Sequence, residues 1–202
     1  MPILEFNAYW MTVNSFLAIL AVLFGYFFIR TPNPTLKAIF GVLWLLFLPN
    51  TIYIFTDLQH IIEQWNKVTV GQGIVLVLQY IVLEMVGLFT FVLGFHPFER
   101  IINQFHALKR NKIRLIVGFN FLIAFGMVLG RVERVNSWEV FTNPLNVLLS
   151  TIHVLTSLQL IGLTVLFGLV CNFIYFLARD FTFQKSKKWL RKTSGMALKL
   201  LD

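Results

Sequence analysis

The sequence contains little charge. Only 13% of its 202 residues are Asp, Glu, Lys or Arg, whereas 57% are apolar; a typical soluble domain has about a quarter charged residues. A soluble domain of this size lacks the interior volume to bury so much apolar surface, and a disordered chain is far less hydrophobic. Both classes are therefore excluded, which leaves an integral membrane protein.

Cysteine and the common catalytic motifs are also scarce. The chain has one cysteine, Cys171, inside an apolar run, so neither an intrachain disulfide nor a cysteine-rich zinc site can form. No P-loop, GxSxG or dinucleotide-binding pattern occurs, and we expect no cofactor. The first charge is Glu5, and no basic segment precedes the first apolar run, so a cleaved signal peptide is not expected.

Long apolar runs dominate the rest of the chain. A spanning helix needs about 20 mostly apolar residues, and the runs show no period-two alternation that would indicate strands. We expect spanning helices at Tyr9–Ile29, Leu36–Phe55, Gly73–Phe95, Ile113–Gly130 and Gln159–Ala178.

The last apolar run is longer than one span requires. Leu145–Ala178 has no charged residue in 34 positions, and a continuous helix of that length would measure about 51 Å, against a hydrocarbon core of about 30 Å. We therefore expect Leu145–Leu158 to form a juxtamembrane or tilted extension. A re-entrant pair, which would give six passes, is the alternative.

The predicted fold is an all-α polytopic bundle of about five transmembrane helices. No linker is long enough to separate two domains, so residues 1–180 are expected to form one transmembrane domain, followed by a basic tail, residues 181–202. In the tail, apolar residues recur at near-helical spacing between lysines, and we expect either an interfacial helix on the anionic leaflet or a solvated end. These apolar residues are Trp189, Leu190, Met196, Leu200 and Leu201.

The basic residues predict the orientation. The net charge is +8, and fourteen of the 17 Lys and Arg residues lie in the first connection, the third connection and the tail; the other three are Lys67, Arg131 and Arg134. Because cytoplasmic loops carry the excess of basic residues, the N-terminus is predicted outside and the C-terminus in the cytoplasm. Basic residues beside apolar runs favour contact with anionic membrane lipid, and no nucleic acid partner is expected.

Polar residues gather at the predicted outer end of two spans. In the second span, Pro49 should kink or end the helix, and Asn50, Tyr53, Asp57 and His60 follow at helical spacings of 3, 4 and 3 residues, which places them on one stripe. A polar stripe at the edge of a bilayer should face protein or water.

The second polar group follows the fourth span. Gly126 and Gly130 allow close helix approach, and Arg131 comes directly after them, so it needs an anionic partner near the hydrocarbon boundary. Asp57 is the predicted partner, because the topology places it at a similar depth. Further polar residues of this segment are Glu133, Arg134, Asn136, Ser137 and Glu139.

Glu84 is a carboxylate in the middle of the third predicted span. Asn120 lies midway along the fourth span, and we expect it to hydrogen-bond Glu84 in its neutral form. A proton-carrying role is the alternative, although no second buried ionisable residue indicates a relay.

Several short elements of the two polar segments together resemble a known family. They are Leu48-Pro49-Asn50, Tyr53-Ile54, Thr56-Asp57-Leu58, Gly130-Arg131, Arg134 and Asn136-Ser137-Trp138-Glu139. In this order they resemble the signature of the bacterial membrane-protein family catalogued as domain of unknown function 1361. The resemblance implies a multi-pass protein of the bacterial inner (cell) membrane with no established activity, and it supplies no catalytic residues.

The sequence therefore favours a five-span bundle with an outward-facing polar pocket. Asp57 and Arg131 would form its central pair, and the ligand would be a lipid headgroup, an envelope intermediate or a partner membrane protein. The residues expected to line it are Asn50, Tyr53, His60, Arg134, Asn136 and Glu139.

Two other functions stay open from the sequence. A membrane-embedded enzyme acting on lipid or envelope substrates would use Asp57 or Glu133 as acid or base, with or without a metal ion; no metal-binding motif supports the metal. A proton-coupled transporter would use Glu84, but inverted repeats are not visible.

Overall fold

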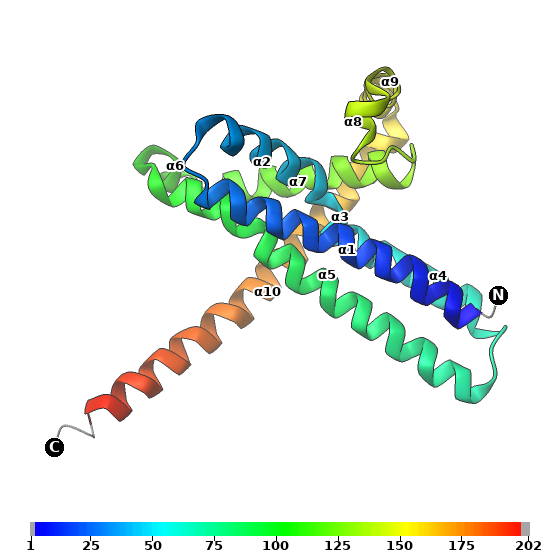
Figure 1. The fold of residues 1–202 in the computed structure, drawn as a ribbon, viewed down its shortest axis with the longest axis horizontal. Helices are drawn as coiled ribbons and strands as arrows, with labels where there is room; N and C mark the ends of the chain where they lie inside the picture. Colours follow the sequence, from blue (N-terminus) through cyan, green and yellow to red (C-terminus); the bar gives the residue numbers. More distant parts are fainter. Residues whose placement is uncertain (1–2, 199–202) are drawn as a thin grey trace.

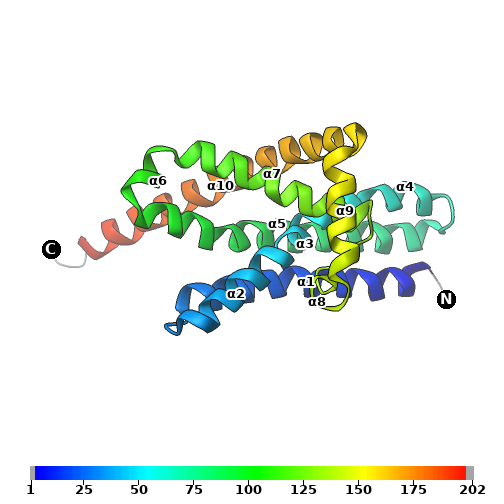
Figure 2. The ribbon, with the colours of Figure 1, turned by 90° about the horizontal axis from the view of Figure 1, so that it is seen from above.

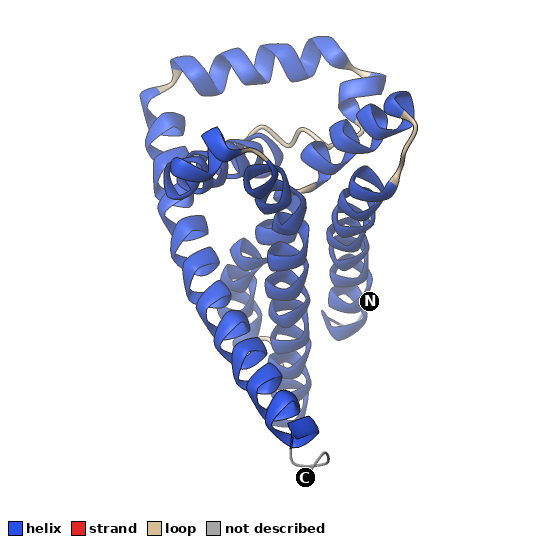
Figure 3. Cartoon of the chain, turned by 90° about the vertical axis from the view of Figure 1, so that its left-hand side faces the viewer, coloured by secondary structure: helices blue, strands red, loops and turns tan. Residues whose placement is uncertain are grey.

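The computed structural model describes residues 3–198, with side chains described from residue 3 to residue 179. These residues form helices joined by short loops (Figure 3). Five helical segments are long and apolar enough to cross a membrane, which confirms the predicted number: Ile3–Arg30, Pro34–Trp65, Val70–Gln104, Lys112–Arg131 and Leu158–Arg179.

The second of these segments is interrupted, and short helices connect the others. The elements in chain order are α1 (Ile3–Arg30), α2 (Pro34–Phe47), α3 (Pro49–Tyr53), the 3₁₀ helix η1 (Ile54–Leu58), α4 (Gln59–Trp65), α5 (Val70–Gln104), α6 (His106–Arg110), α7 (Lys112–Arg131), α8 (Glu139–Thr142), α9 (Pro144–Thr156) and α10 (Leu158–Leu198).

Successive spans run in alternating directions along the molecule (Figure 1). The α1–α2 connection and α6 lie at one end, which we call the α6 end. The start of α1 and the α4–α5 connection lie at the other, which we call the N end. The connections thus alternate between the ends, as a five-span topology requires.

Aromatic packing fills the interior toward the α6 end. The Trp44 indole donates a hydrogen bond to the Gly94 carbonyl at 2.8 Å, and a Cβ added at Gly25 would lie 2.9 Å from the Trp44 ring. The Phe98 and Phe119 rings stack with centroids 3.9 Å apart. Gly25 therefore leaves room for a large ring between helices. These ring contacts fix the position of α5 along its axis relative to α2 and α7.

The spans α5 and α7 have unequal lengths, 35 and 20 residues. Because α6 joins them at one end, and Phe98 faces Phe119, α7 ends at Arg131 beside the middle of α5. The first part of α5 continues past this level by about 15 residues, or about 22 Å at the helical rise. Glu84 therefore lies level with Arg131, and Asn120 lies level with Pro97.

The apolar run 145–178 forms two helices instead of one. The first helix, α9, ends at Thr156, Ser157 is extended, and α10 begins at Leu158. In Figure 2, α9 crosses the bundle at a steep angle to α5 and α7. The extension predicted beside the last span is thus a separate crossing helix, and its outward face exposes Leu145, Leu148, Leu149, Ile152 and Leu155.

The last helix continues beyond its apolar part. α10 runs to Leu198, and residues 199–202 lie outside the described part. The predicted position of the tail on a membrane leaflet concerns side chains beyond residue 179, which also lie outside the described ones, so it stays a prediction.

Candidate functional site

The ion pair predicted between the two polar segments is present. Arg131 Nη1 lies 2.9 Å from Asp57 Oδ1, so the pairing expected from the topology is confirmed. The Asp57 side chain is 3% exposed and that of Arg131 is 20% exposed. Since both charges are largely removed from solvent, each depends on the other for its compensation.

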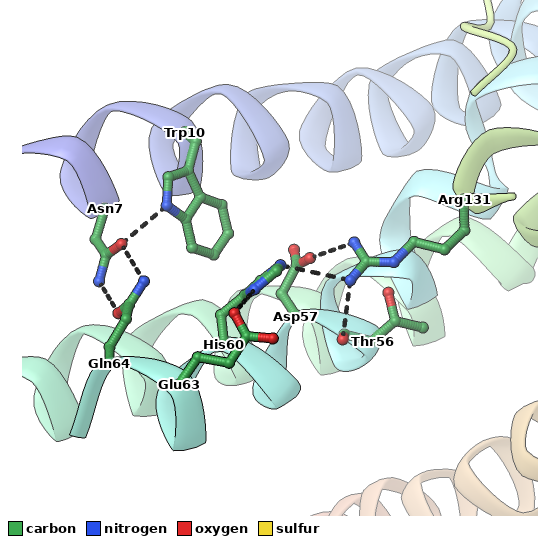
Figure 4. Close-up of polar contacts among 8 residues, drawn as sticks. All are labelled: Asn7, Trp10, Thr56, Asp57, His60, Glu63, Gln64 and Arg131. Carbon is green, nitrogen blue, oxygen red and sulfur yellow. Dashed lines mark hydrogen bonds and ion pairs between the residues drawn. The ribbon is translucent and has the colours of Figure 1, made fainter. Parts of the chain in front are cut away.

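Arg131 contacts residues on successive turns of the second span. Its guanidinium donates to the Tyr53 hydroxyl at 3.3 Å and to the Thr56 carbonyl at 3.4 Å. The Tyr53 ring centroid lies 5.3 Å from Arg131 Cζ, and His60 Nε2 lies 3.5 Å from Nη2. Figure 4 shows Thr56, Asp57 and His60 directed toward Arg131. Tyr53, Asp57 and His60 therefore share the stripe predicted from their spacing.

The polar contacts continue toward the N end between α1 and α4. Asn14 donates to Asp57 Oδ2 at 3.0 Å. Farther along, Asn7 and Gln64 exchange hydrogen bonds of 2.6 and 3.0 Å, and Trp10 donates to Asn7 at 3.0 Å (Figure 4). Sequence reasoning missed this α1 side. Asn7, just before the first predicted span, and Asn14, within it, are seven residues apart, and this spacing would have indicated one inward-facing polar edge.

The Asn50 side chain hydrogen-bonds the backbone where the helix breaks at Pro49. Pro49 has no N–H, and the regular helix is interrupted between α2 and α3. Side chains donate to carbonyls beside this break: Asn50 donates to the Phe47 carbonyl at 2.9 Å, and the Thr51 hydroxyl donates to the Leu48 carbonyl at 2.7 Å. Ser137 donates to the Leu46 carbonyl at 2.8 Å. In a membrane span such replacement donors are what make a broken helix tolerable.

A cavity of about 410 Å³ lies beside this break. It is enclosed by α1, α2, α3, α7 and the segment from residue 135 to α9, and most of its walls are Leu, Ile, Phe, Val, Pro and Gly. Two of its wall residues, Leu45 and Leu122, are 44% and 56% exposed, so the cavity opens between α2 and α7. Its polar lining comes from Asn14, Asn50, Tyr53, Asn136 and Ser137.

Only some of the predicted pocket residues line this cavity. Asn50, Tyr53 and Asn136 do, whereas Asp57 and Arg131 pair beside it and His60 lies on the far side of that pair. The predicted pocket is therefore divided into a buried ion-pair cluster and an apolar cavity with a polar end, because Tyr53 stands between them.

Glu139 holds the segment after α7 in shape. Its carboxylate accepts from the Asn136 backbone at 2.9 Å, from the Asn136 side chain at 2.8 Å and from Asn146 at 3.1 Å. These hydrogen bonds lower the pKa of Glu139, the bond to the Asn136 backbone contributing most. The Glu139 carboxylate thus links α8 to α9 through these hydrogen bonds.

Two other charged residues of this segment differ in their contacts. Glu133 lies 2.9 Å from His153 Nδ1 of α9. Arg134 is exposed, makes no hydrogen bond or ion pair with residues whose side chains are described, and has φ of 56°. A left-handed backbone at a residue other than glycine costs about 1–2 kcal/mol, so the chain holds Arg134 in a strained turn with its guanidinium unengaged.

The predicted bond between Asn120 and Glu84 is wrong. Asn120 donates to Asn172 of α10 at 3.0 Å, while neither oxygen of Glu84 has a hydrogen-bond partner. The prediction assumed that the third and fourth spans share a midplane. Because α5 extends past α7, Glu84 lies instead beside the level of Arg131.

No group of three or more His, Cys, Asp or Glu side chains is arranged to hold a metal ion within the described part of the chain. Cys171 is buried, with its sulfur 3.7 Å from that of Met127.

Fold and site together define a polytopic helical membrane protein with a buried ion pair between its second and fourth spans. The model of the family described as "Protein of unknown function (DUF1361)" matches residues 13–174, and the chain belongs to this family. No curated protein and no solved structure matches the chain.

Proposed function

We propose that this protein binds a long-chain anionic lipid, or an envelope intermediate of the same chemistry, in the cavity beside Pro49. The observation that carries the proposal is the cavity itself, about 410 Å³ in volume, largely apolar, and polar at the end formed by Asn136 and Ser137. Sites for small ligands have about 300–1,000 Å³ and a few polar groups on apolar walls.

The apolar part of the cavity suits an acyl or isoprenoid chain. Its opening lies between two exposed leucines, Leu45 of α2 and Leu122 of α7, and α2 also exposes Leu36, Ile39 and Val42. A lipid would thus enter sideways from the bilayer without crossing water. Exposed apolar residues of α9 extend the same lipid-facing surface next to the polar end.

The headgroup of the lipid would meet Arg134. This arginine belongs to the turn that also supplies Asn136 to the cavity, and its guanidinium is exposed and uncompensated by the described side chains. Arginine recognises phosphate through two parallel hydrogen bonds, and strained backbone is characteristic of functional turns. Phosphate is therefore the headgroup chemistry that the turn fits best.

We also propose that the protein lies in a bacterial inner membrane with its N-terminus outside. The unequal distribution of Lys and Arg between the connections supports this orientation, and the α1–α2 connection and α6, which are both basic, lie at the same end of the bundle.

The test measures the lipid that copurifies with the protein. Replacement of Leu122 by Trp should fill the mouth of the cavity and remove most bound lipid, and Arg134→Gln should reduce bound anionic lipid about tenfold, as loss of a charge-assisted contact predicts. The measurement is native mass spectrometry with quantification of extracted phospholipid.

Leu166→Trp is the matched control, because Leu166 of α10 is 55% exposed, close to the 56% of Leu122, but does not line the cavity. It should leave the bound lipid unchanged. Equal lipid content in all three variants and the parent protein would show that the cavity is not the binding site.

A further inference from the structure

Tyr80 and Glu84, which lie on one face of α5, carry buried polar atoms without a hydrogen-bond partner. Tyr80 is 2% exposed and its hydroxyl has no hydrogen-bond partner. Both carboxylate oxygens of Glu84, one turn farther along, are also buried without a partner. Polar groups buried in this way cost free energy, and in a span they mark functional sites by default.

The contacts on either side show where these groups point. Tyr80, Glu84 and Gly87 follow at spacings of 4 and 3 residues and so share a face of α5. A Cβ at Gly87 would lie 3.1 Å from the Thr51 carbonyl oxygen and from Ile54, and the Tyr80 ring meets Trp10 of α1, 6.3 Å between centroids. Glu84, between them, is therefore directed at η1 and its Asp57, close enough for the two carboxylates to interact.

The local charges do not balance. Arg131 compensates Asp57 alone, so an ionised Glu84 leaves one negative charge without a partner. The other titratable groups facing this space are His60 and Glu63 of α4, which bond each other at 3.5 Å; α1 contributes the neutral side chains Trp10 and Asn14. An ionised Glu84 thus lacks a counter-charge, and the buried side-chain atoms without a hydrogen-bond partner among the described residues are all oxygens.

We propose that Tyr80, Glu84 and Asp57 form a second site, separate from the lipid cavity, that holds a single positive charge, supplied by Na⁺ or by a proton. Oxygen ligands suit a hard cation. The Tyr80 hydroxyl would contribute a lone pair, Glu84 a carboxylate, and Asp57 the oxygen that Asn14 already orients. The 3₁₀ turn of η1, which interrupts the regular helix opposite Glu84, is a structure found where helices serve as hinges or sites.

The experiment measures thermal unfolding of the full-length protein in detergent by tryptophan fluorescence. The sodium arm compares NaCl with choline chloride at equal ionic strength and about pH 8, where a solvated glutamate is ionised. The proton arm compares about pH 8 with about pH 5.5 in choline chloride alone.

If Na⁺ occupies the site, NaCl should raise the Tm of the parent protein by at least about 2 °C. If the occupant is a proton, acidification should raise it by a similar amount and NaCl should have no effect. In either case Glu84→Gln should abolish the response, and without sodium at about pH 8 its Tm should exceed that of the parent, because a neutral amide needs no counter-charge.

Two further variants test the role of the Tyr80 hydroxyl and control for loss of a carboxylate. Tyr80→Phe retains the ring against Trp10 but removes the hydroxyl, so it should weaken the response to whichever ion binds. Glu5→Gln removes an exposed carboxylate at the start of α1, at the same end of the molecule, and should respond as the parent does. The proposal is overturned if Glu84→Gln responds to both ions as the parent does, or if Tyr80→Phe is indistinguishable from it.

Discussion

At the residue scale, the buried pair of Asp57 and Arg131 dominates the electrostatics of the interior. Asp57 accepts from Arg131 and from Asn14, so helices α1 and α7 are both tied to η1 through a single carboxylate. Removing one member of such a pair is costly because the remaining charge is buried without a counter-charge or solvent. Replacing both members by apolar residues is often tolerated.

Asp57→Asn is therefore expected to lower the free energy of unfolding by about 3 kcal/mol. The double variant Asp57→Leu/Arg131→Met should recover most of this loss, because no uncompensated charge remains. Denaturant titration in micelles of Asp57→Leu, Arg131→Met and their double variant, analysed as a double-mutant cycle, measures the coupling. Additive losses from the two single changes would contradict the account.

The pairing of these two residues followed from sequence because each sits at the end of a recognisable apolar run. The partners of Asn50 and Ser137 did not follow, since they bind carbonyls that become available only when the helix breaks at Pro49. A polar residue beside a proline has two roles open to it, ligand binding and repair of the broken helix, and only the geometry separates them.

At the element scale, the contact of α7 with the break in the second span is set by one glycine. A Cβ at Gly126 would lie 2.5 Å from Pro49 Cγ, and the proline ring cannot bend away as a flexible side chain does. The small residues at the end of the fourth span thus serve close helix packing, as their spacing indicated.

Gly126→Ala should destabilise the protein by about 1–3 kcal/mol, the usual cost of overpacking, and should lower its Tm. Gly118→Ala is the control on the same helix, because nothing lies within 4 Å of a Cβ built there. A thermal shift assay of both variants measures the difference. Equal melting temperatures for the two variants would refute the close contact.

The number of spans could be predicted because helix length against membrane thickness is a strong constraint. The relative level of the spans could not. It depends on contacts such as Phe98 against Phe119, which places α7 beside one half of α5, and Trp44 against Gly94, which places α2. The same displacement explains why Asn120 meets Asn172 while Glu84 remains without a partner. The break at Ser157 also left no proline or glycine signal in the sequence.

At the scale of the whole molecule, the proposed orientation predicts which surfaces are reachable from outside the cell. In a Cys171→Ser background, single cysteines replacing Glu63 and Glu139 should react with an impermeant maleimide on intact cells. A cysteine replacing Lys109 in α6 should react only after the membrane is opened. Protection of position 63 or 139 while position 109 reacts would contradict the proposed orientation.

The unequal lengths of α5 and α7 have a consequence for the surrounding bilayer. Beyond the level where α7 ends, α5 still exposes apolar side chains at Val70, Ile74, Leu78 and Ile81. The hydrophobic girdle of the protein is therefore taller on one flank than on the other. Lipids that surround such a wedge must stretch beside α5 and shorten beside α7, or the whole bundle must lean. A chain of this shape would gather at borders between thick and thin patches of membrane.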